Sequence, residues 1–211
     1  KLQIIISMLK KQGLYLPEFE HDNCGAGFIC SLTGKRSNDI IHKALEILVK
    51  LEHRGAVSSD GTTGDGAGIL IDIPHKFFNI FCDFDRPDAG EYAVGNVFIP
   101  RKENQRTYCV EVFEEEIKKQ GLKILGWRDA PVNSDVLGEI AKETEPFVKQ
   151  IFISKLNSKQ SEYDFNLKLF AARKIAEHTI YDSKLSESKF FYLPSLSTKI
   201  IIFKGLLKPE H

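Results

Sequence analysis

A cysteine with small neighbours is the residue of this sequence best suited to covalent chemistry. Cys24 ends a polar run, residues 20–23, and is followed by Gly25-Ala26-Gly27. A cysteine at the start of an apolar stretch is either a small hydrophobic side chain that packs or a thiol that acts as a nucleophile. The second interpretation would make Cys24 the first residue of a mature enzyme.

The glycine-rich run at residues 60–68 is a second candidate, for phosphate binding. A phosphate-binding loop follows a strand and opens a helix, whereas this run precedes a predicted strand. No lysine follows the run, as it would in a P-loop. We therefore interpret the run as a tight structural turn, in which Asp65 organises the backbone.

Two further polar groups do not decide a function by residue type alone. His21, Cys24 and Cys30 lie close in sequence, but a zinc site needs about four ligands at short paired spacings. The sequence therefore predicts no metal site. His53 and Arg54 follow a predicted helix, where the helix dipole favours cations, so a structural role explains them as well as a functional one.

Hydrophobic periodicity and turn residues predict the elements that position these groups. The predicted strands are residues 25–32, 66–73, 92–99, 122–128, 147–154, 190–193 and 200–203. The predicted helices are residues 38–52, 103–120 and 164–180, with a short helix that begins after Pro74. Strand 66–73 is expected to be buried on both faces, and the last two strands to form a hairpin around Pro194-Ser195.

Composition limits the class of protein. The chain has 211 residues, of which 42% are hydrophobic, which is enough for a substantial core. Its 29 basic and 29 acidic residues balance, so neither nucleic acid nor a membrane surface is indicated as a partner. Four cysteines in a chain of this length fit a reducing compartment. One α/β or α+β domain is expected, and the pattern alone leaves a strictly parallel sheet open.

Six sequence blocks, in order, resemble the class II glutamine amidotransferase domain of the glutamate synthase large-chain family, which belongs to the N-terminal-nucleophile hydrolases. The first three are H-D-N-C-G-A-G-F-I at 21–29, L-E-H-R-G-A at 51–56 and T-G-D-G-A-G-I-L at 63–70. The others are Y-A-V-G-N-V-F-I-P at 92–100, G-W-R-D-A-P at 126–131 and Y-L-P-S-L-S-T-K-I-I-I-F-K-G-L at 192–206. The resemblance covers almost the whole chain.

The resemblance implies a fold and a reaction. The fold is α+β, an αββα sandwich of two stacked antiparallel sheets between helical layers. Residues 1–23 become a propeptide or N-terminal extension, and 24–211 the amidotransferase domain. Cys24 then attacks the side-chain amide of glutamine, its own α-amine serves as the base, and a thioester forms and is hydrolysed. The released ammonia is used to make glutamate from 2-oxoglutarate.

The resemblance also assigns roles to residues near Cys24. Gly25, Arg54 and Gly55 match the motifs that support the catalytic cysteine, and a cation at Arg54 would favour the thiolate. The family's carboxylate-binding R-F-S-T motif and its oxyanion-hole Asn-Gly pair do not occur in the sequence. The domain is therefore expected to be truncated at its C-terminus, and the chain as written to be an inactive precursor fragment.

Cofactors, partners and location follow from the same resemblance. No cofactor is expected in this chain, whereas FMN and an iron–sulfur cluster are expected in the missing parts of the parent enzyme. The expected partners are glutamine and the remaining domains of glutamate synthase, and the expected location is the cytoplasm, with a plastid as the alternative. One competing hypothesis is a non-catalytic, truncated or split module that binds a partner carrying the missing half. A second is an N-terminal-nucleophile amidase that acts on another amide, which the block G-W-R-D-A-P disfavours.

Overall fold

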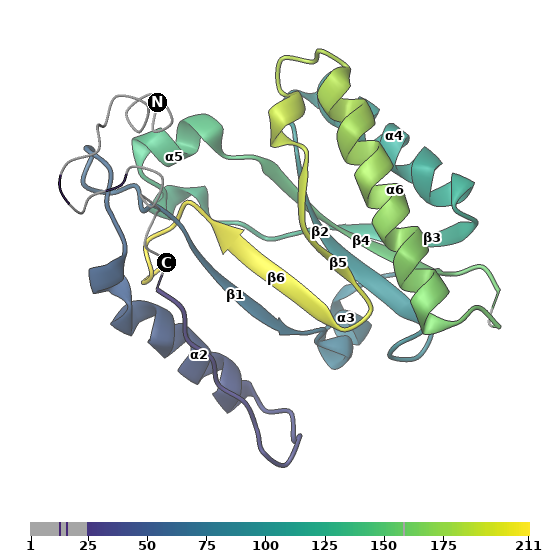
Figure 1. Ribbon diagram of the computed structural model, residues 1–211, viewed down its shortest axis with the longest axis horizontal. Helices are drawn as coiled ribbons and strands as arrows, with labels where there is room; N and C mark the ends of the chain where they lie inside the picture. The colour runs from purple at the N-terminus through teal and green to yellow at the C-terminus, as the bar shows by residue number, and fades with distance from the viewer. Residues whose placement is uncertain (1–12, 14–15, 17–24, 158) are drawn as a thin grey trace.

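The computed structural model describes residues 13, 16, 25–157 and 159–211, so Cys24 and His21 lie outside the described residues. The described chain is arranged in four layers, a helical layer, two sheets and a second helical layer (Figure 1). All the strand pairs within the two sheets are antiparallel. The expected α+β class is therefore confirmed, and the parallel alternative is wrong.

The helices lie close to where hydrophobic periodicity predicts them. They are α2 (Asn38–Lys50), α3 (His75–Phe81), α4 (Glu103–Lys119), α5 (Glu139–Thr144) and α6 (Glu162–Asp182). Short 3-10 helices are η2 (Glu52–Arg54), η3 (Ser134–Val136) and η4 (Ser188–Phe190). Of the α-helices in the described residues, α5 alone was not predicted. Within the part of the chain that the structure describes, no helix combines the length and apolar character needed to cross a membrane.

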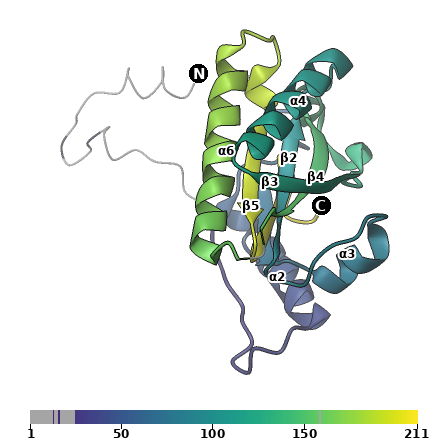
Figure 2. The ribbon, with the colours of Figure 1, turned by 90° about the vertical axis from the view of Figure 1, so that its right-hand side faces the viewer.

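The larger sheet carries the main core. It has the order β3-β4-β2-β5, with β2 (Tyr92–Ile99) and β4 (Phe147–Lys155) at its centre and β3 (Leu122–Asp129) and β5 (Tyr192–Ser197) at its edges. Helices α4 and α6 pack side by side on one face (Figure 2). One face of α6 is buried there, and its residues follow the helix period: Phe165, Leu169, Ala172, Ala176 and Ile180.

The smaller sheet pairs β1 (Ala67–Asp72) with β6 (Ile200–Gly205) and stacks on the larger one. Ile71 and Ile201 lie in a second core with Val94 and Phe152 of the larger sheet. Helix α2 lies on the other side of β1 (Figure 1).

The prediction that strand 66–73 is buried on both faces is wrong. Its burial alternates, and Leu70 is 57% exposed, because α2 covers the outer face only in part.

The predicted hairpin at residues 190–203 is also wrong. β5 pairs with β2 and β6 pairs with β1, so the two consecutive strands belong to different sheets. Pro194 lies within β5 rather than in the turn, at the irregular part of its register with β2. A proline is tolerated there because β5 is an edge strand and the missing N–H breaks no regular ladder.

Residues 25–32 do not form the predicted strand. Residues 25–31 have no regular structure, and Phe28 and Leu32 are 90% and 99% exposed. The apolar run alone suggested a strand, but an isolated strand needs a neighbour to satisfy its backbone groups. Among the described residues, the smaller sheet contains only β1 and β6, and neither strand pairs with residues 25–32.

Candidate active site

A cavity of about 1010 Å³ lies beside the smaller sheet. Its lining includes three of the predicted site residues, Gly25, Arg54 and Gly55, together with Asp65. Strand β1, the segment around α5 and residues 204–207 supply other parts of the wall. The volume is at the upper end of the range of about 300–1,000 Å³ for small-molecule sites.

Gly25 and Arg54 lie against each other. A β-carbon built on Gly25 would be 3.2 Å from Cβ of Arg54 and 3.4 Å from Cβ of Leu51. Leu51 is the C-cap of α2, and the single 3-10 turn η2 follows it. This change of direction places Arg54 beside the segment at Gly25. Because a side chain at Gly25 would press on Arg54, glycine allows this close approach.

Gly55 lies against Asp65 in the same wall. A β-carbon built on Gly55 would be 3.2 Å from Oδ1 of Asp65, and the Asp65 N–H donates to the Ala56 carbonyl over 3.1 Å. Val57 and Gly64 form an isolated antiparallel bridge one step further out. Residues 56–65 are therefore a small hairpin, called here the 56–65 hairpin, and its base adjoins Arg54.

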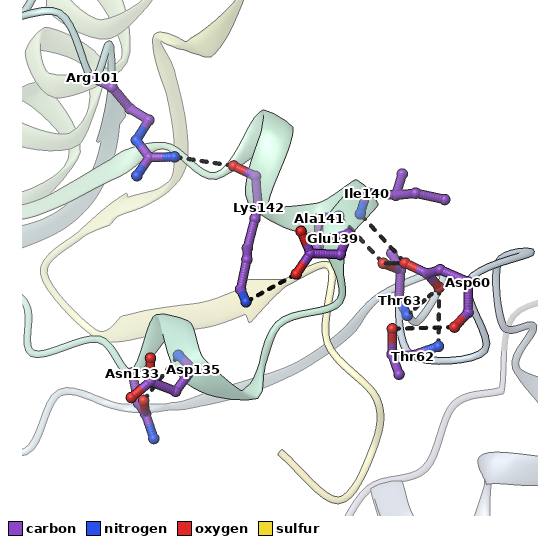
Figure 3. Close-up of polar contacts among 10 residues, drawn as sticks. All are labelled: Asp60, Thr62, Thr63, Arg101, Asn133, Asp135, Glu139, Ile140, Ala141 and Lys142. Carbon is purple, nitrogen blue, oxygen red and sulfur yellow. Dashed lines mark hydrogen bonds and ion pairs between the residues drawn. The ribbon is translucent and has the colours of Figure 1, made fainter.

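The tip of the 56–65 hairpin is organised by Asp60. Its Oδ1 accepts the backbone N–H groups of Thr62 and Thr63, over 3.0 and 2.8 Å, and its Oδ2 accepts the Thr63 hydroxyl over 2.5 Å (Figure 3). The hydrogen bonds from the Thr63 hydroxyl and from these backbone groups hold the pKa of Asp60 far below its usual range. The turn-organising role predicted for Asp65 thus belongs to Asp60.

The hairpin is held by close backbone contacts. A β-carbon on Gly64 would be 2.3 Å from the Leu207 carbonyl oxygen, and one on Gly138 would be 2.3 Å from the Thr63 hydroxyl. These two glycines allow the hairpin to lie directly against the chain after β6 and against the start of α5. The run Asp60-Gly61-Thr62-Thr63 is a sequence signal for such a turn, because Asp and Thr side chains bond nearby backbone groups.

The structure thus brings together Gly25, Arg54 and Gly55, while the predicted nucleophile Cys24 lies outside the described residues. Among the residues that the structure describes, no group of three or more His, Cys, Asp or Glu side chains could hold a metal ion. Asp60 and α5 are the parts of this region that the sequence analysis missed.

The chain belongs to the class II glutamine amidotransferases, since the model of that family matches residues 24–211. It is 42% identical to the glutamate synthase [NADPH] large chain of Bacillus subtilis over 96% of this chain and 13% of that protein. It is 41% identical to glutamate synthase [NADH] of Saccharomyces cerevisiae, over 94% of this chain and 10% of the relative.

A plant relative is also similar. Ferredoxin-dependent glutamate synthase 2, chloroplastic, of Arabidopsis thaliana is 36% identical over 97% of this chain and 13% of its own length. The chain therefore spans only about a tenth of the length of the curated relatives that it matches.

Proposed function

We propose that this chain is the glutaminase part of a glutamate synthase, which hydrolyses the side-chain amide of glutamine and supplies ammonia for glutamate synthesis from 2-oxoglutarate. The family match, which begins at Cys24, carries this proposal. The convergence of Gly25, Arg54 and Gly55 in the wall of one cavity supports it.

The proposed nucleophile is the thiol of Cys24, after removal of residues 1–23. Cleavage of the Asn23–Cys24 bond frees an α-amine, whose pKa of about 7.7–8.0 lies close to that of a thiol, about 8.5. The amine can therefore take the thiol proton near neutral pH. The sulfur attacks the amide carbon of glutamine, and the amine returns the proton to the departing nitrogen, which leaves as ammonia.

Water completes the proposed cycle. The γ-glutamyl thioester is attacked by a water molecule whose proton passes to the same amine, and glutamate leaves as the thiolate is regenerated. We assign Arg54 the role of a cation that favours this thiolate, since its Cβ lies against the residue bonded to Cys24. Gly25 and Gly55 provide the space that this arrangement needs.

The rest of the proposed reaction lies outside this chain. We assign FMN, the iron–sulfur cluster and the 2-oxoglutarate site to the other parts of the parent polypeptide. The relatives' names give NADPH, NADH or ferredoxin as electron donors of those proteins. We propose the cytoplasm as the location, with a plastid as the alternative because one relative is chloroplastic.

The proposal is tested on the whole polypeptide that contains this chain. N-terminal sequencing of the mature protein should read Cys-Gly-Ala-Gly-Phe. Cys24→Ala should abolish glutamine-dependent glutamate synthesis, because alanine cannot form the thioester, and leave ammonia-dependent synthesis largely intact. Cys24→Ser should be nearly as inactive, since a hydroxyl is a far weaker nucleophile near neutral pH.

The matched control is Cys30→Ala, because Cys30 is an exposed free cysteine close in sequence to Cys24. This variant should keep glutamine-dependent activity. Glutamine use by Cys24→Ala at the wild-type rate would instead make Cys24 a packing residue and leave the chain a non-catalytic module.

A further inference from the structure

We propose that Asp60 is a positioning residue for the glutaminase site, which it serves by fixing the 56–65 hairpin to α5 and thereby the Arg54–Gly55 wall beside Gly25. This inference rests on the proposed function. It concerns a carboxylate that does not line the cavity and whose role depends on three successive contacts between the larger sheet and the site.

The first contact fixes α5 to the frame of the larger sheet. Arg101, just beyond the end of β2, donates to the Lys142 carbonyl over 3.0 Å and lies 3.7 Å from the Glu145 carboxylate. Glu145 also accepts the Ser134 hydroxyl over 2.5 Å. Ala141 is 2% exposed, so one side of the short helix is packed against the protein. α5 is therefore held at both its buried face and its C-terminal end.

The second contact joins α5 to the tip of the 56–65 hairpin. The N–H of Ile140 donates to Oδ2 of Asp60 and that of Ala141 to the hydroxyl of Thr63, each over 3.3 Å (Figure 3). The first N–H groups of a helix have no partner within the helix, and a side chain usually caps them from the preceding residues. Here the caps come from a hairpin about 80 residues earlier in the chain.

The third set of contacts connects the tip of the 56–65 hairpin to its base. Asp60 fixes Thr62 and Thr63, Thr63 is 2% exposed, and the strands of the hairpin are bridged at Val57 and Gly64. The base then places Asp65 against Gly55, the residue that follows Arg54. A shift at the tip therefore moves the wall that adjoins Gly25.

A charged carboxylate suits this role better than its amide. Asp60 accepts four donors, namely the N–H groups of Thr62, Thr63 and Ile140 and the hydroxyl of Thr63. Asparagine offers one acceptor oxygen and one donor nitrogen in the same volume. Asp60→Asn would therefore leave the two donors at Oδ2 facing an NH₂ group, and the attachment of the hairpin to α5 would be weakened without a change in side-chain size.

The test compares Asp60→Asn, Thr63→Val and Thr63→Ser in the whole polypeptide, with Asp85→Asn as the control. Asp85 is exposed and accepts no hydrogen bond from the described residues. The readouts are kcat and KM for glutamine hydrolysis, the pH dependence of Cys24 alkylation by iodoacetamide, and ammonia-dependent glutamate synthesis. The alkylation profile reports the apparent pKa of the Cys24 thiol, which a merely structural role would leave unchanged.

Asp60→Asn and Thr63→Val should lower kcat for glutamine about tenfold to a hundredfold, as displacements near 1 Å do, and raise the apparent pKa of the Cys24 thiol. Thr63→Ser, which keeps the hydroxyl, and Asp85→Asn should behave as wild type, and ammonia-dependent synthesis should be retained throughout. Wild-type kcat and alkylation in Asp60→Asn would overturn the positioning role. So would an equal loss of the ammonia-dependent activity. If the wild-type protein hydrolysed glutamine no faster than Cys24→Ala, the proposed function would be overturned as well.

Discussion

At the scale of single residues, Arg54 supplies the nearest side-chain atom to the β-position of Gly25. A cation on a side chain that starts beside the residue bonded to Cys24 should stabilise the thiolate. We therefore expect Arg54→Ala to raise the apparent pKa of Cys24 and to slow glutamine hydrolysis about tenfold, which corresponds to about 1.4 kcal/mol. Because the raised pKa removes thiolate mainly at low pH, the loss should shrink as pH rises. Stopped-time glutaminase assays across pH measure this.

Arg54→Lys separates charge from shape. Lysine keeps the cation but lacks the planar guanidinium, so it should recover much of the activity if charge is what Arg54 supplies. A loss in Arg54→Lys as large as in Arg54→Ala, with an unchanged alkylation profile, would point to packing of the Arg54 side chain instead. His53→Ala is the neighbouring control, since the His53 ring bonds only the Lys50 carbonyl among the described groups.

The sequence predicted the residues near Arg54 only where they belong to a recognised motif. The sequence blocks indicated Gly25, Arg54 and Gly55, and these three line one cavity. Local turn rules fit Asp60 as well as the predicted Asp65, because both lie in one glycine-rich run. The bonds of Asp60 to Thr62 and Thr63 are local, whereas its contact with Ile140 joins residues 80 apart and is contained in no local pattern.

At the scale of elements, the 56–65 hairpin depends on Gly64. A β-carbon there would be 2.3 Å from the Leu207 carbonyl oxygen and 2.6 Å from its carbon, so backbone must move to admit even alanine. We expect Gly64→Ala to destabilise the protein by about 1–3 kcal/mol, the usual cost of overpacking. Urea unfolding measures it as a lower midpoint.

Gly61→Asn is the matched control within the same hairpin. Gly61 has φ +68° with nothing within 4 Å of its β-position, and asparagine tolerates this left-handed conformation better than most residues. Its unfolding midpoint should stay close to that of the wild type. Equal midpoints for Gly64→Ala and wild type would mean that the backbone around Leu207 can shift without a loss in the free energy of unfolding.

Elements with strong periodicity were predictable, and those defined by their partners were not. The bounds of β2 match the prediction, because β2 is a largely apolar run that is followed by Pro100. The bounds of α4 and α6 differ from the prediction by only a few residues, because their buried side chains recur with the helix period. Strand 25–32 and the hairpin at 190–203 were wrong, because pairing is decided by which distant strand is free. Helix α5 has only six residues, too few for a periodic signal.

At the scale of the whole molecule, Asn96 joins the two sheets. Its side-chain amide donates to the Ile202 carbonyl of the smaller sheet and accepts from Gln150 of the larger one, and both side chains are 2% exposed. Asn96→Ala would leave these buried partners unpaired, so we expect a loss of about 1–3 kcal/mol in the free energy of unfolding. Urea unfolding, followed by circular dichroism, tests this.

Asn104→Ala provides the comparison, because Asn104 is exposed on α4. Alanine has the higher helix propensity, so this variant should be as stable as wild type or slightly more so. If both variants unfolded at the same urea concentration, the polar link between the sheets would contribute nothing measurable to stability. The stacking itself was not predictable from composition or periodicity and was indicated only by the family resemblance.

The pairing of β1 with β6 also determines when, during synthesis of the chain, the region around the 56–65 hairpin can fold. Ala67 pairs with Gly205, and Gly64 rests on Leu207, so the frame behind the 56–65 hairpin is completed by residues that the ribosome adds far later. A chain grows at about 5–20 residues per second, and its early parts fold first only when their partners exist. Any cleavage at Asn23–Cys24 that requires the assembled site must therefore wait for Leu207 to emerge. On the proposed mechanism, the α-amine of Cys24 would remain in a peptide bond until then, and the nascent chain would carry no active nucleophile.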